Sequence, residues 1–198
     1  DGRPDRRIVL AEGLNRPTGL AFRNGDLYVA EIDKLWKLPG IESRLDQPPK
    51  PVMIRADLPD KTHHGWRFID FGPDGKLYLA IGAPCNVCKP EAFTAGPDKL
   101  EFASITRMDA DGRNWEVVAR GVRNSVGFGW HPKTRQLWFT DNGRDMLGDD
   151  TPSCELNKVG KTGEDFGFPY CHAGAVSDPD FGKDRSCSAA TAPVALLG

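Results

Sequence analysis

The sequence has no long apolar run, no strong excess of charge of either sign and no convincing helical periodicity. None of its apolar runs approaches the ~20 residues that a transmembrane helix needs, and the hydrophobic stretch of a secretory signal is absent. The formal net charge of −2 is too small to hold nucleic acid or a membrane surface by bulk electrostatics. A chain of 198 residues can still bury a substantial core. We therefore expect a globular domain with no nucleic-acid partner and no membrane span in this segment.

Five cysteines are present, and their spacing leaves several chemistries open. Cys85 and Cys88 form a C-x-x-C pattern, which occurs in redox motifs, in half of a zinc site and in short disulfides. Zinc needs a second ligand pair and a thioredoxin-like motif needs a βαβ context, and neither is visible. Cys171 and Cys187 flank a loop rich in Gly, Asp and Ser, while Cys154 is either free or paired outside the chain. The loop-rich composition favours disulfides, and with them an oxidising compartment.

Three segments repeat one pattern of two apolar runs around a tight polar turn. Such runs predict β-hairpins at residues 16–32, 66–82 and 125–143. Their equivalent leucines, Leu27, Leu77 and Leu137, are 50 and 60 residues apart. Periods of this size, with several strands in each, are typical of β-propeller blades.

Further segments fit the remaining strands of each blade. Residues 34–38 and 104–112 fit a third strand, the latter with a turn at 109–112, and residues 51–58 and 115–122 fit a fourth strand. Residues 1–17 also echo residues 111–126, so the register recurs beyond the hairpins.

About three blades cannot close a ring, because propellers close with four to eight blades. Three blades leave two open sheet edges. The segment begins inside a turn-like sequence, without Met, and no capping element is predicted at its end. We therefore expect residues 1–198 to be a partial β-propeller domain in which the start and the end of the ring are missing.

Two polar loops precede the inner strands of the second and third blades, where propeller loops face the central channel. The first holds His63, His64 and Arg67; a histidine there can act as a general base, because its pKa lies near neutrality. Turn histidines beside a surface ion pair are the alternative. The second holds Arg123 and Asn124, which suit a carboxylate ligand or a clamp between blades.

A third polar loop, residues 140–150, follows the second strand of the third blade. Carboxylates and backbone carbonyls in a loop with glycine suit Ca²⁺, which prefers oxygen ligands. The spacing of an EF-hand loop is absent, and a solvated acidic loop without metal is the alternative.

Five stretches, in order along most of the chain, together resemble the PQQ-dependent sugar dehydrogenases, and most closely the glucose/sorbosone branch with its L-sorbosone-type and fungal pyranose dehydrogenases. They are HHGWRFIDFGPDGKLYLAIGAPCNVC (63–88), ARGVRNSVGFGWHP (119–132), LWFTDNGRDMLGDD (137–150), ELNKV (155–159) and FGFPYCHAG (166–174). The resemblance implies an all-β, six-bladed β-propeller, of which this chain covers about three blades. It also implies pyrroloquinoline quinone (PQQ) in the central channel, and oxidation of an aldose, sorbosone or similar pyranose by hydride transfer to the quinone.

The resemblance also implies roles for the catalytic and cofactor-binding residues. The family's histidine base lies in an H-x-G-x-R-like segment, which His63 and Arg67 match. Counting back from the Gly-Pro-Asp turn favours His64 instead, so His63 is the first choice and His64 the second. The family's Arg-Asn pair on the cofactor corresponds to Arg123 and Asn124.

For the metal, the resemblance implies a catalytic Ca²⁺ held by the backbone carbonyls of Gly143 and Arg144. A second, structural Ca²⁺ of some relatives corresponds to Glu155 and to the carbonyl of Phe166. Cys85–Cys88 and Cys171–Cys187 look like local disulfides, while Cys154 stands where an acidic residue is expected.

The resemblance thus implies a periplasmic or secreted quinoprotein oxidoreductase that passes electrons to a cytochrome or a quinone. A Ca²⁺-dependent sugar lactonase on a similar propeller and a non-catalytic propeller that binds carbohydrate or protein are the alternatives. Relatives also hold the cofactor with Lys and Arg residues of later blades, so we expect the 198-residue segment alone to be inactive.

Overall fold

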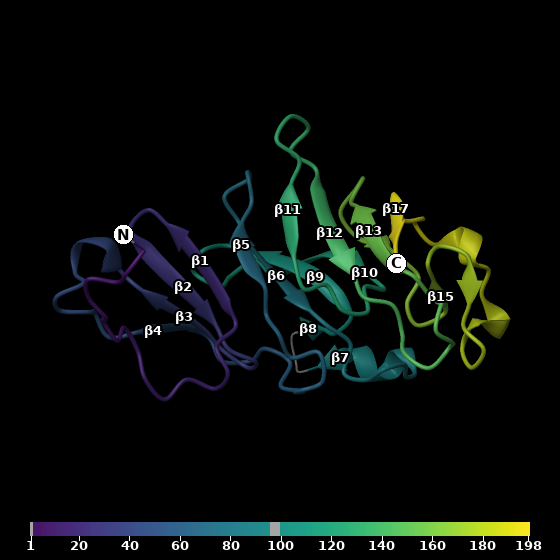
Figure 1. Cartoon of the computed structure of the whole chain (residues 1–198), viewed down its shortest axis with the longest axis horizontal. Coiled ribbons are helices and arrows are strands. Elements are labelled where there is room, and N and C mark those ends of the chain that lie inside the picture. The colour runs from purple at the N-terminus through teal and green to yellow at the C-terminus, as the bar shows by residue number, and fades with distance from the viewer. Residues whose placement is uncertain (1, 96–99) are drawn as a thin grey trace.

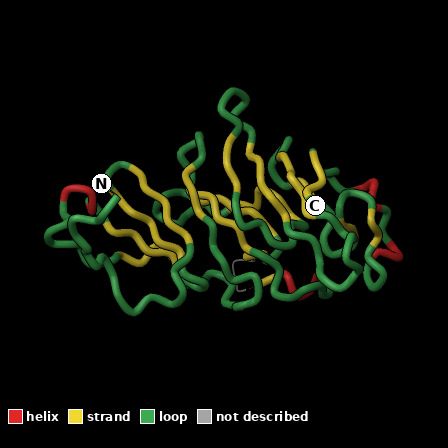
Figure 2. Tube along the Cα trace, in the orientation of Figure 1, coloured by secondary structure: helices red, strands yellow, loops and turns green. Residues whose placement is uncertain are grey.

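The computed structural model describes the chain except residues 1 and 96–99. Its regular structure consists of strands and four short 3₁₀ helices, and the described residues contain no α-helix (Figure 2). Three sheets lie side by side in chain order (Figure 1). The lack of helical periodicity in the sequence agrees with this architecture.

The three sheets are three blades, each with four antiparallel strands in chain order. The first blade contains β1 (Gly19–Arg23), β2 (Asp26–Ala30), β3 (Leu35–Leu38) and β4 (Val52–Arg55). The second contains β5 (Ile69–Phe71), β6 (Leu77–Ile81), β9 (Ser104–Met108) and β10 (Glu116–Arg120). The third contains β11 (Phe128–Trp130), β12 (Leu137–Asp141), β13 (Cys154–Lys158) and β17 (Ala195–Leu197).

Short elements decorate the loops between these strands. They are β7 (Thr94–Ala95), β8 (Leu100–Glu101), β14 (Glu164–Asp165), β15 (Cys171–His172) and β16 (Val176–Ser177), with the 3₁₀ helices η1 (Ile41–Ser43), η2 (Pro90–Phe93), η3 (Gly182–Asp184) and η4 (Cys187–Ala189). Strand β14 pairs in parallel with the edge of β10. It ties the segment between β13 and β17 of the third blade to the second blade.

The predicted hairpins form because their turns satisfy strict backbone requirements. Asn24 and Gly25, between β1 and β2, adopt φ values of 52° and 83°, which is the two-residue turn that matches strand twist. Gly75 adopts 83° between β5 and β6. The predicted hairpins and the predicted third and fourth strands of the first two blades are confirmed.

Neighbouring blades pack face to face through aromatic rings and arginine clamps. The rings of Phe68 and Phe128 meet edge to face at 4.8 Å between the second and third blades. Arg23 of the first blade donates to the Gly75 carbonyl at 2.6 Å, and Arg135 of the third donates to the Pro73 carbonyl at 2.7 Å. One arginine from each neighbouring blade thus donates to the turn between β5 and β6 of the second blade.

The two ends of the chain differ from the expectation. Residues 2–17 form no strand although they echo a segment that contains β10. Leu10 and Leu14 instead pack on Val29 and Leu38. At the other end, where no element is predicted, β17 completes the third blade after an excursion of more than thirty residues.

Candidate active site

The three polar loops singled out in the sequence meet at one end of the second and third blades. The Ala83 amide, just after β6, donates to the Arg123 carbonyl at 2.7 Å, and the Asn142 amide donates to the Asn124 carbonyl at 3.1 Å. The histidine loop joins them through His64, whose Nδ1 lies 2.9 Å from the Ala83 carbonyl oxygen. Segments up to 80 residues apart are thereby fixed to one another.

One hydrogen bond fixes the tautomer of His64 and leaves its other ring nitrogen free to accept a proton. A carbonyl only accepts, so Nδ1 carries the proton and Nε2 keeps its lone pair. Burial, with the nearby charge of Arg123, lowers the pKa of His64 to about 4 and keeps the ring neutral. His63 is exposed, and its ring packs edge-on against that of His64 with centroids 4.1 Å apart.

The position of His64 depends on close contact with the backbone of Gly82. A Cβ atom on Gly82 would lie 2.5 Å from the His64 Cβ and 3.0 Å from the Asn124 Oδ1. Real Cβ atoms do not approach so closely, so glycine is required between the histidine and the asparagine.

Replacing Gly82 by alanine is therefore expected to push His64 and Asn124 apart. In the full-length protein the kcat of a reaction that depends on His64 should then fall at least tenfold, since displacements of ~1 Å at a reacting group can cost ~100-fold. Gly127→Ala is the matched control, because a Cβ there meets no atom within 4 Å. Steady-state kinetics of both variants check this. Equal activity of the two variants would contradict the described contact.

The buried side chain of Arg67 holds the loop that carries His63 and His64. Its side chain is completely buried and donates from Nε to the Ile32 carbonyl at 3.1 Å and from Nη2 to the Pro59 carbonyl at 2.7 Å. Its Nη1 donates to the His64 carbonyl at 3.3 Å, where the backbone adopts an unusual φ of 46°. The guanidinium therefore fixes the loop and does not reach the open surface.

Arg123 lies at the centre of the cluster, with every N–H of its guanidinium bonded. Nη1 donates to the carbonyls of Asn142 (3.1 Å) and Gly143 (2.7 Å). Nε donates to the Asn86 carbonyl at 2.9 Å, and Nη2 donates to the Asn86 Oδ1 at 2.7 Å and to Asp145 at 3.3 Å. The bond to Asp145 is the longest, and it leads to a side chain that is 75% exposed.

Asp141, the last residue of β12, is a functional candidate that the sequence indicated only as one carboxylate of the loop 140–150, with no role of its own. Its two carboxylate oxygens accept the backbone amides of Arg123 (2.9 Å) and Asn124 (2.6 Å), so it orients this pair. It corresponds to Glu31 through the equivalent leucines, and Glu31 is also buried. That recurrence of an acidic residue at the end of the second strand was the available signal.

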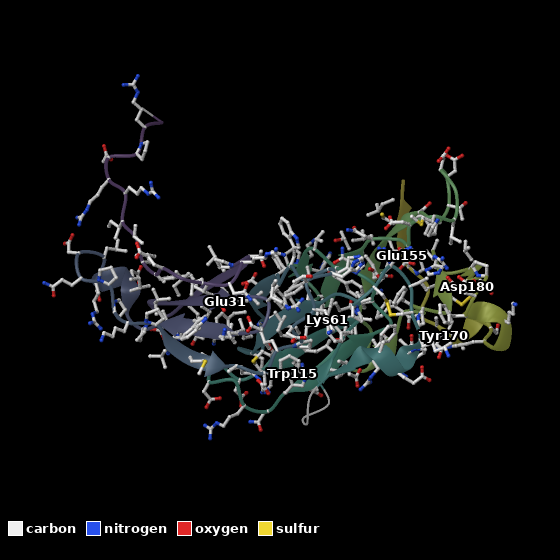
Figure 3. The ribbon with its side chains drawn as sticks, turned by 90° about the horizontal axis from the view of Figure 1, so that it is seen from below. Glu31, Lys61, Trp115, Glu155, Tyr170 and Asp180 are labelled. Atoms are coloured by element: carbon white, nitrogen blue, oxygen red, sulfur yellow. A yellow bond between two sulfur atoms is a disulfide. The ribbon has the colours of Figure 1, made fainter. Side chains whose placement is uncertain are left out.

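A small cavity gathers most of the predicted metal ligands. Its volume is about 10 Å³, which is room for one water molecule or ion. The lining includes Arg123, Asp141, Gly143, Glu155 and Phe166. Figure 3 shows Glu155 toward the same end of the molecule as Tyr170 and Asp180, away from Glu31.

The two carboxylates of this cavity are costly to bury. Asp141 and Glu155 are directly paired across β12 and β13. Burial, with the neighbouring Glu155, raises the pKa of Asp141 to about 8, and burial also raises the pKa of Glu155. Asn157 donates to the Glu155 Oε2 at 2.8 Å. The described residues contain no cluster of three or more His, Cys, Asp or Glu side chains able to hold a metal, so a cation here would need backbone carbonyls as well.

The side chain of Arg144 turns away from the cavity into the C-terminal loops. Its Nη1 donates to the buried carboxylate of Asp178, whose Oδ2 also lies 2.8 Å from the His172 Nε2. Only the backbone of Arg144 is thus left for the predicted metal role.

Both predicted disulfides are present. Cys85–Cys88 closes the loop after β6, and Cys171–Cys187 closes the loop that carries β15 and β16. Cys154 is free and half-buried on β13. It directly precedes Glu155 on β13, where the resemblance implied an acidic residue.

Comparison with known proteins identifies the family. The glucose/sorbosone dehydrogenase family model matches residues 50–196. The chain belongs to this family. A protein of Borreliella burgdorferi without an assigned function is 33% identical over 177 residues, which is 84% of this chain and 45% of that protein. The chain thus spans less than half the length of that relative.

Solved structures show the same fold at lower identity. The PQQ-bound aldose sugar dehydrogenase of Streptomyces coelicolor is 20% identical, with a TM-score of 0.58 over 97% of this chain and 71% of that protein. A calcium structure of a family AA12 carbohydrate-active enzyme from Trichoderma reesei is 18% identical, with a TM-score of 0.67 over 78% of this chain and 44% of that protein. The family-model match confirms the predicted family, and the solved structures confirm the predicted fold class, an all-β chain that covers part of a β-propeller. Within the part of the chain that the structure describes, no helix has both the length and the apolarity to cross a bilayer.

Proposed function

We propose that this chain is part of a PQQ-dependent sugar dehydrogenase, in which a histidine takes the hydroxyl proton of the sugar. The observation that carries the proposal is the neutral, half-buried His64 fixed against the loop that presents Arg123 and Asn124. In this proposal His64 is the base, Arg123 binds the anionic cofactor, and the cavity with two buried carboxylates holds the metal ion. Membership of the glucose/sorbosone dehydrogenase family supports the same chemistry.

The contacts of Arg123 support a binding position for an anionic group of the quinone. PQQ carries three carboxylates, and Arg123 has no spare N–H group while Asp145 is bound. The Asp145 carboxylate is exposed and makes the longest of the five bonds. We propose that an anionic group of the cofactor replaces the Asp145 carboxylate, because this partner is the most weakly held of the five. We propose that the Asn124 amide also contacts the cofactor; its Oδ1 lies close to Gly82, as does His64.

The cavity fits Ca²⁺ by the chemistry of its oxygen atoms. Two buried carboxyl groups, Asp141 and Glu155, line it together with Gly143, and hard oxygen ligands of this kind suit Ca²⁺. The raised pKa values of both carboxyl groups are the cost that a bound cation would offset. We propose that one Ca²⁺ occupies this cavity, with the carbonyls of Gly143 and Arg144 as ligands. The second ion, on Glu155 and the Phe166 carbonyl, stays a prediction, because both residues line the same cavity and its volume of about 10 Å³ admits one ion.

In the proposed reaction His64 accepts the proton of the sugar hydroxyl at Nε2, because Nδ1 is held by Ala83. When bound, PQQ accepts the hydride and Ca²⁺ acts as a Lewis acid on it. Arg67 acts as a positioning residue through the His64 carbonyl. His63, the first choice from the sequence motif, covers the outer side of the His64 ring.

The remaining expectations extend this proposal to the whole protein. We propose that residues 1–198 are three blades of a ring whose start and end lie outside this segment, and that the segment alone is inactive. Large apolar side chains exposed on the outer blades support this, among them Leu20 and Phe22 at 64% and 53% exposure. The two disulfides support an oxidising, periplasmic or secreted location. A cytochrome or a quinone would then reoxidise the cofactor.

The experiment that tests the proposal is calorimetric titration of PQQ into the full-length, metal-free protein, with and without Ca²⁺. We expect a stoichiometric heat with Ca²⁺ and weaker binding without it. A protein that binds carbohydrate but gives no heat with PQQ is the non-catalytic alternative. Hydrolysis of a sugar lactone without an electron acceptor would favour the lactonase and overturn the proposal.

The low pKa of His64 predicts a pH dependence of stability in the cofactor-free protein. Because the folded-state pKa of about 4 lies below the ordinary value of about 6.5, the unfolded chain takes up this proton first. Stability is therefore expected to fall as the pH drops from about 6.5 towards 4. Denaturant unfolding should show that wild-type protein loses more stability over this range than His64→Gln, and equal losses would contradict the assignment.

A further inference from the structure

The disulfide-closed loop after β6 places one side chain against Arg123. Cys85 and Cys88 enclose Asn86, which accepts from Arg123 twice. Its backbone carbonyl accepts from Nε at 2.9 Å, and its Oδ1 accepts from Nη2 at 2.7 Å. Two of the five guanidinium N–H groups are therefore held by this single residue.

Asn86 also holds the loop that follows β12. Its Oδ1 accepts the Asp145 amide at 2.9 Å, and its Nδ2 donates to the Asp145 carbonyl at 3.2 Å. A side-chain amide supplies an acceptor and a donor on neighbouring atoms, and both are used here. Asn86 thus links the second blade to the arginine and to the loop of the predicted calcium ligands.

The loop that carries Asn86 is itself anchored. The Ala83 amide at its start bonds to the Arg123 carbonyl at 2.7 Å. Cys85 and Val87 pack against the buried Phe168 and its neighbours. The disulfide closes the turn between these contacts, so it limits the positions that Asn86 can occupy.

We propose that Asn86 is a positioning residue for Arg123, and that the Cys85–Cys88 disulfide maintains cofactor affinity by holding Asn86 in place. The proposal rests on the function proposed above. Arg123 donates to the Gly143 carbonyl as well, so a guanidinium released by Asn86 would loosen the anion site and the carbonyl loop together. Reduction of this one disulfide then weakens the binding of the quinone.

The test compares PQQ affinity in variants of the full-length protein with Ca²⁺ present. Asn86→Ala and the double variant Cys85→Ser/Cys88→Ser are each expected to raise the Kd for PQQ about tenfold, the effect of losing a hydrogen bond to a charged group. Asn15→Ala is the matched control, because Asn15 bonds to Asp33 in an exposed pair of the first blade. Its Kd is expected to stay within about twofold.

A double-variant cycle separates positioning from a general structural effect. In an Arg123→Lys background, which lacks the fork that Asn86 holds, Asn86→Ala is expected to change the Kd less than about twofold. The same cycle, measured as the free energy of unfolding of the cofactor-free protein, is expected to show that the effects of Asn86→Ala and Arg123→Lys are not additive. An undiminished tenfold effect in the Arg123→Lys background, or an unchanged Kd of Asn86→Ala in a protein that binds PQQ, would overturn the inference. A wild-type protein that binds no PQQ would instead overturn the proposed function, and with it the cofactor role of Asn86.

Discussion

Replacing His64 by alanine in the full-length, PQQ-loaded protein is expected to lower the kcat of sugar oxidation by about 10²–10⁴-fold, the usual contribution of a positioned general base. The physical reason is the fixed tautomer, because the Ala83 carbonyl holds Nδ1 and leaves the Nε2 lone pair for the substrate hydroxyl. The measurement is dye-linked steady-state kinetics at saturating sugar.

His63→Ala is the control for this prediction, since His63 is exposed and contacts the same ring. We expect its kcat to stay within about tenfold of the wild type, because it removes a packing partner and not the base. If His63→Ala abolishes turnover while His64→Ala retains it, the motif spacing H-x-G-x-R identifies the base and the tautomer argument is wrong.

Replacing Arg123 by methionine is expected to weaken PQQ binding by at least about 100-fold. It is also expected to destabilise the fold by about 3–5 kcal/mol, because several neutral acceptors lose their donor at about 1–3 kcal/mol each. Methionine would leave the Asn86 Oδ1 and the carbonyls of Asn142 and Gly143 without their donor. Calorimetry with PQQ and denaturant unfolding measure the two effects.

Arg120→Met is the matched control, because Arg120 lies at the end of β10, three residues before Arg123, and makes a partly exposed pair with Glu101. We expect PQQ affinity to be unchanged and stability to fall by less than about 1 kcal/mol. PQQ affinity that survives Arg123→Met in a folded protein would show that the cofactor does not depend on this guanidinium.

Much of the fold follows from local sequence because a hairpin is decided within some fifteen residues. Alternating apolar residues and turns such as Asn24–Gly25 were enough to predict the hairpin of β1 and β2. The pairing of β17 with β13 was not predictable in the same way, since the two strands are separated by residues 159–194. Residues 2–17 show the converse, because a strand-like sequence there forms no strand and its leucines pack on the first blade instead.

The candidate site was predictable as a set of loops but not as a set of roles. Motif spacing selected His63, yet the contact of His64 with Ala83 depends on a loop almost twenty residues away. Asp141 was predicted only as part of the loop 140–150, because its contacts are with backbone amides that precede it by 17 and 18 residues. Asn86 attracted no attention in the sequence, since the cysteines on both sides of it dominate that pattern.

The most direct test of the central claim is the sugar-dependent reduction of an electron-accepting dye by the full-length protein, before and after reconstitution with PQQ and Ca²⁺. The account predicts no turnover of an aldose or pyranose by the cofactor-free protein, turnover after reconstitution, and its loss in His64→Ala. A reconstituted, folded protein that binds PQQ but oxidises no sugar across a panel of aldoses and pyranoses, or a cofactor-free protein that is equally active, would contradict it.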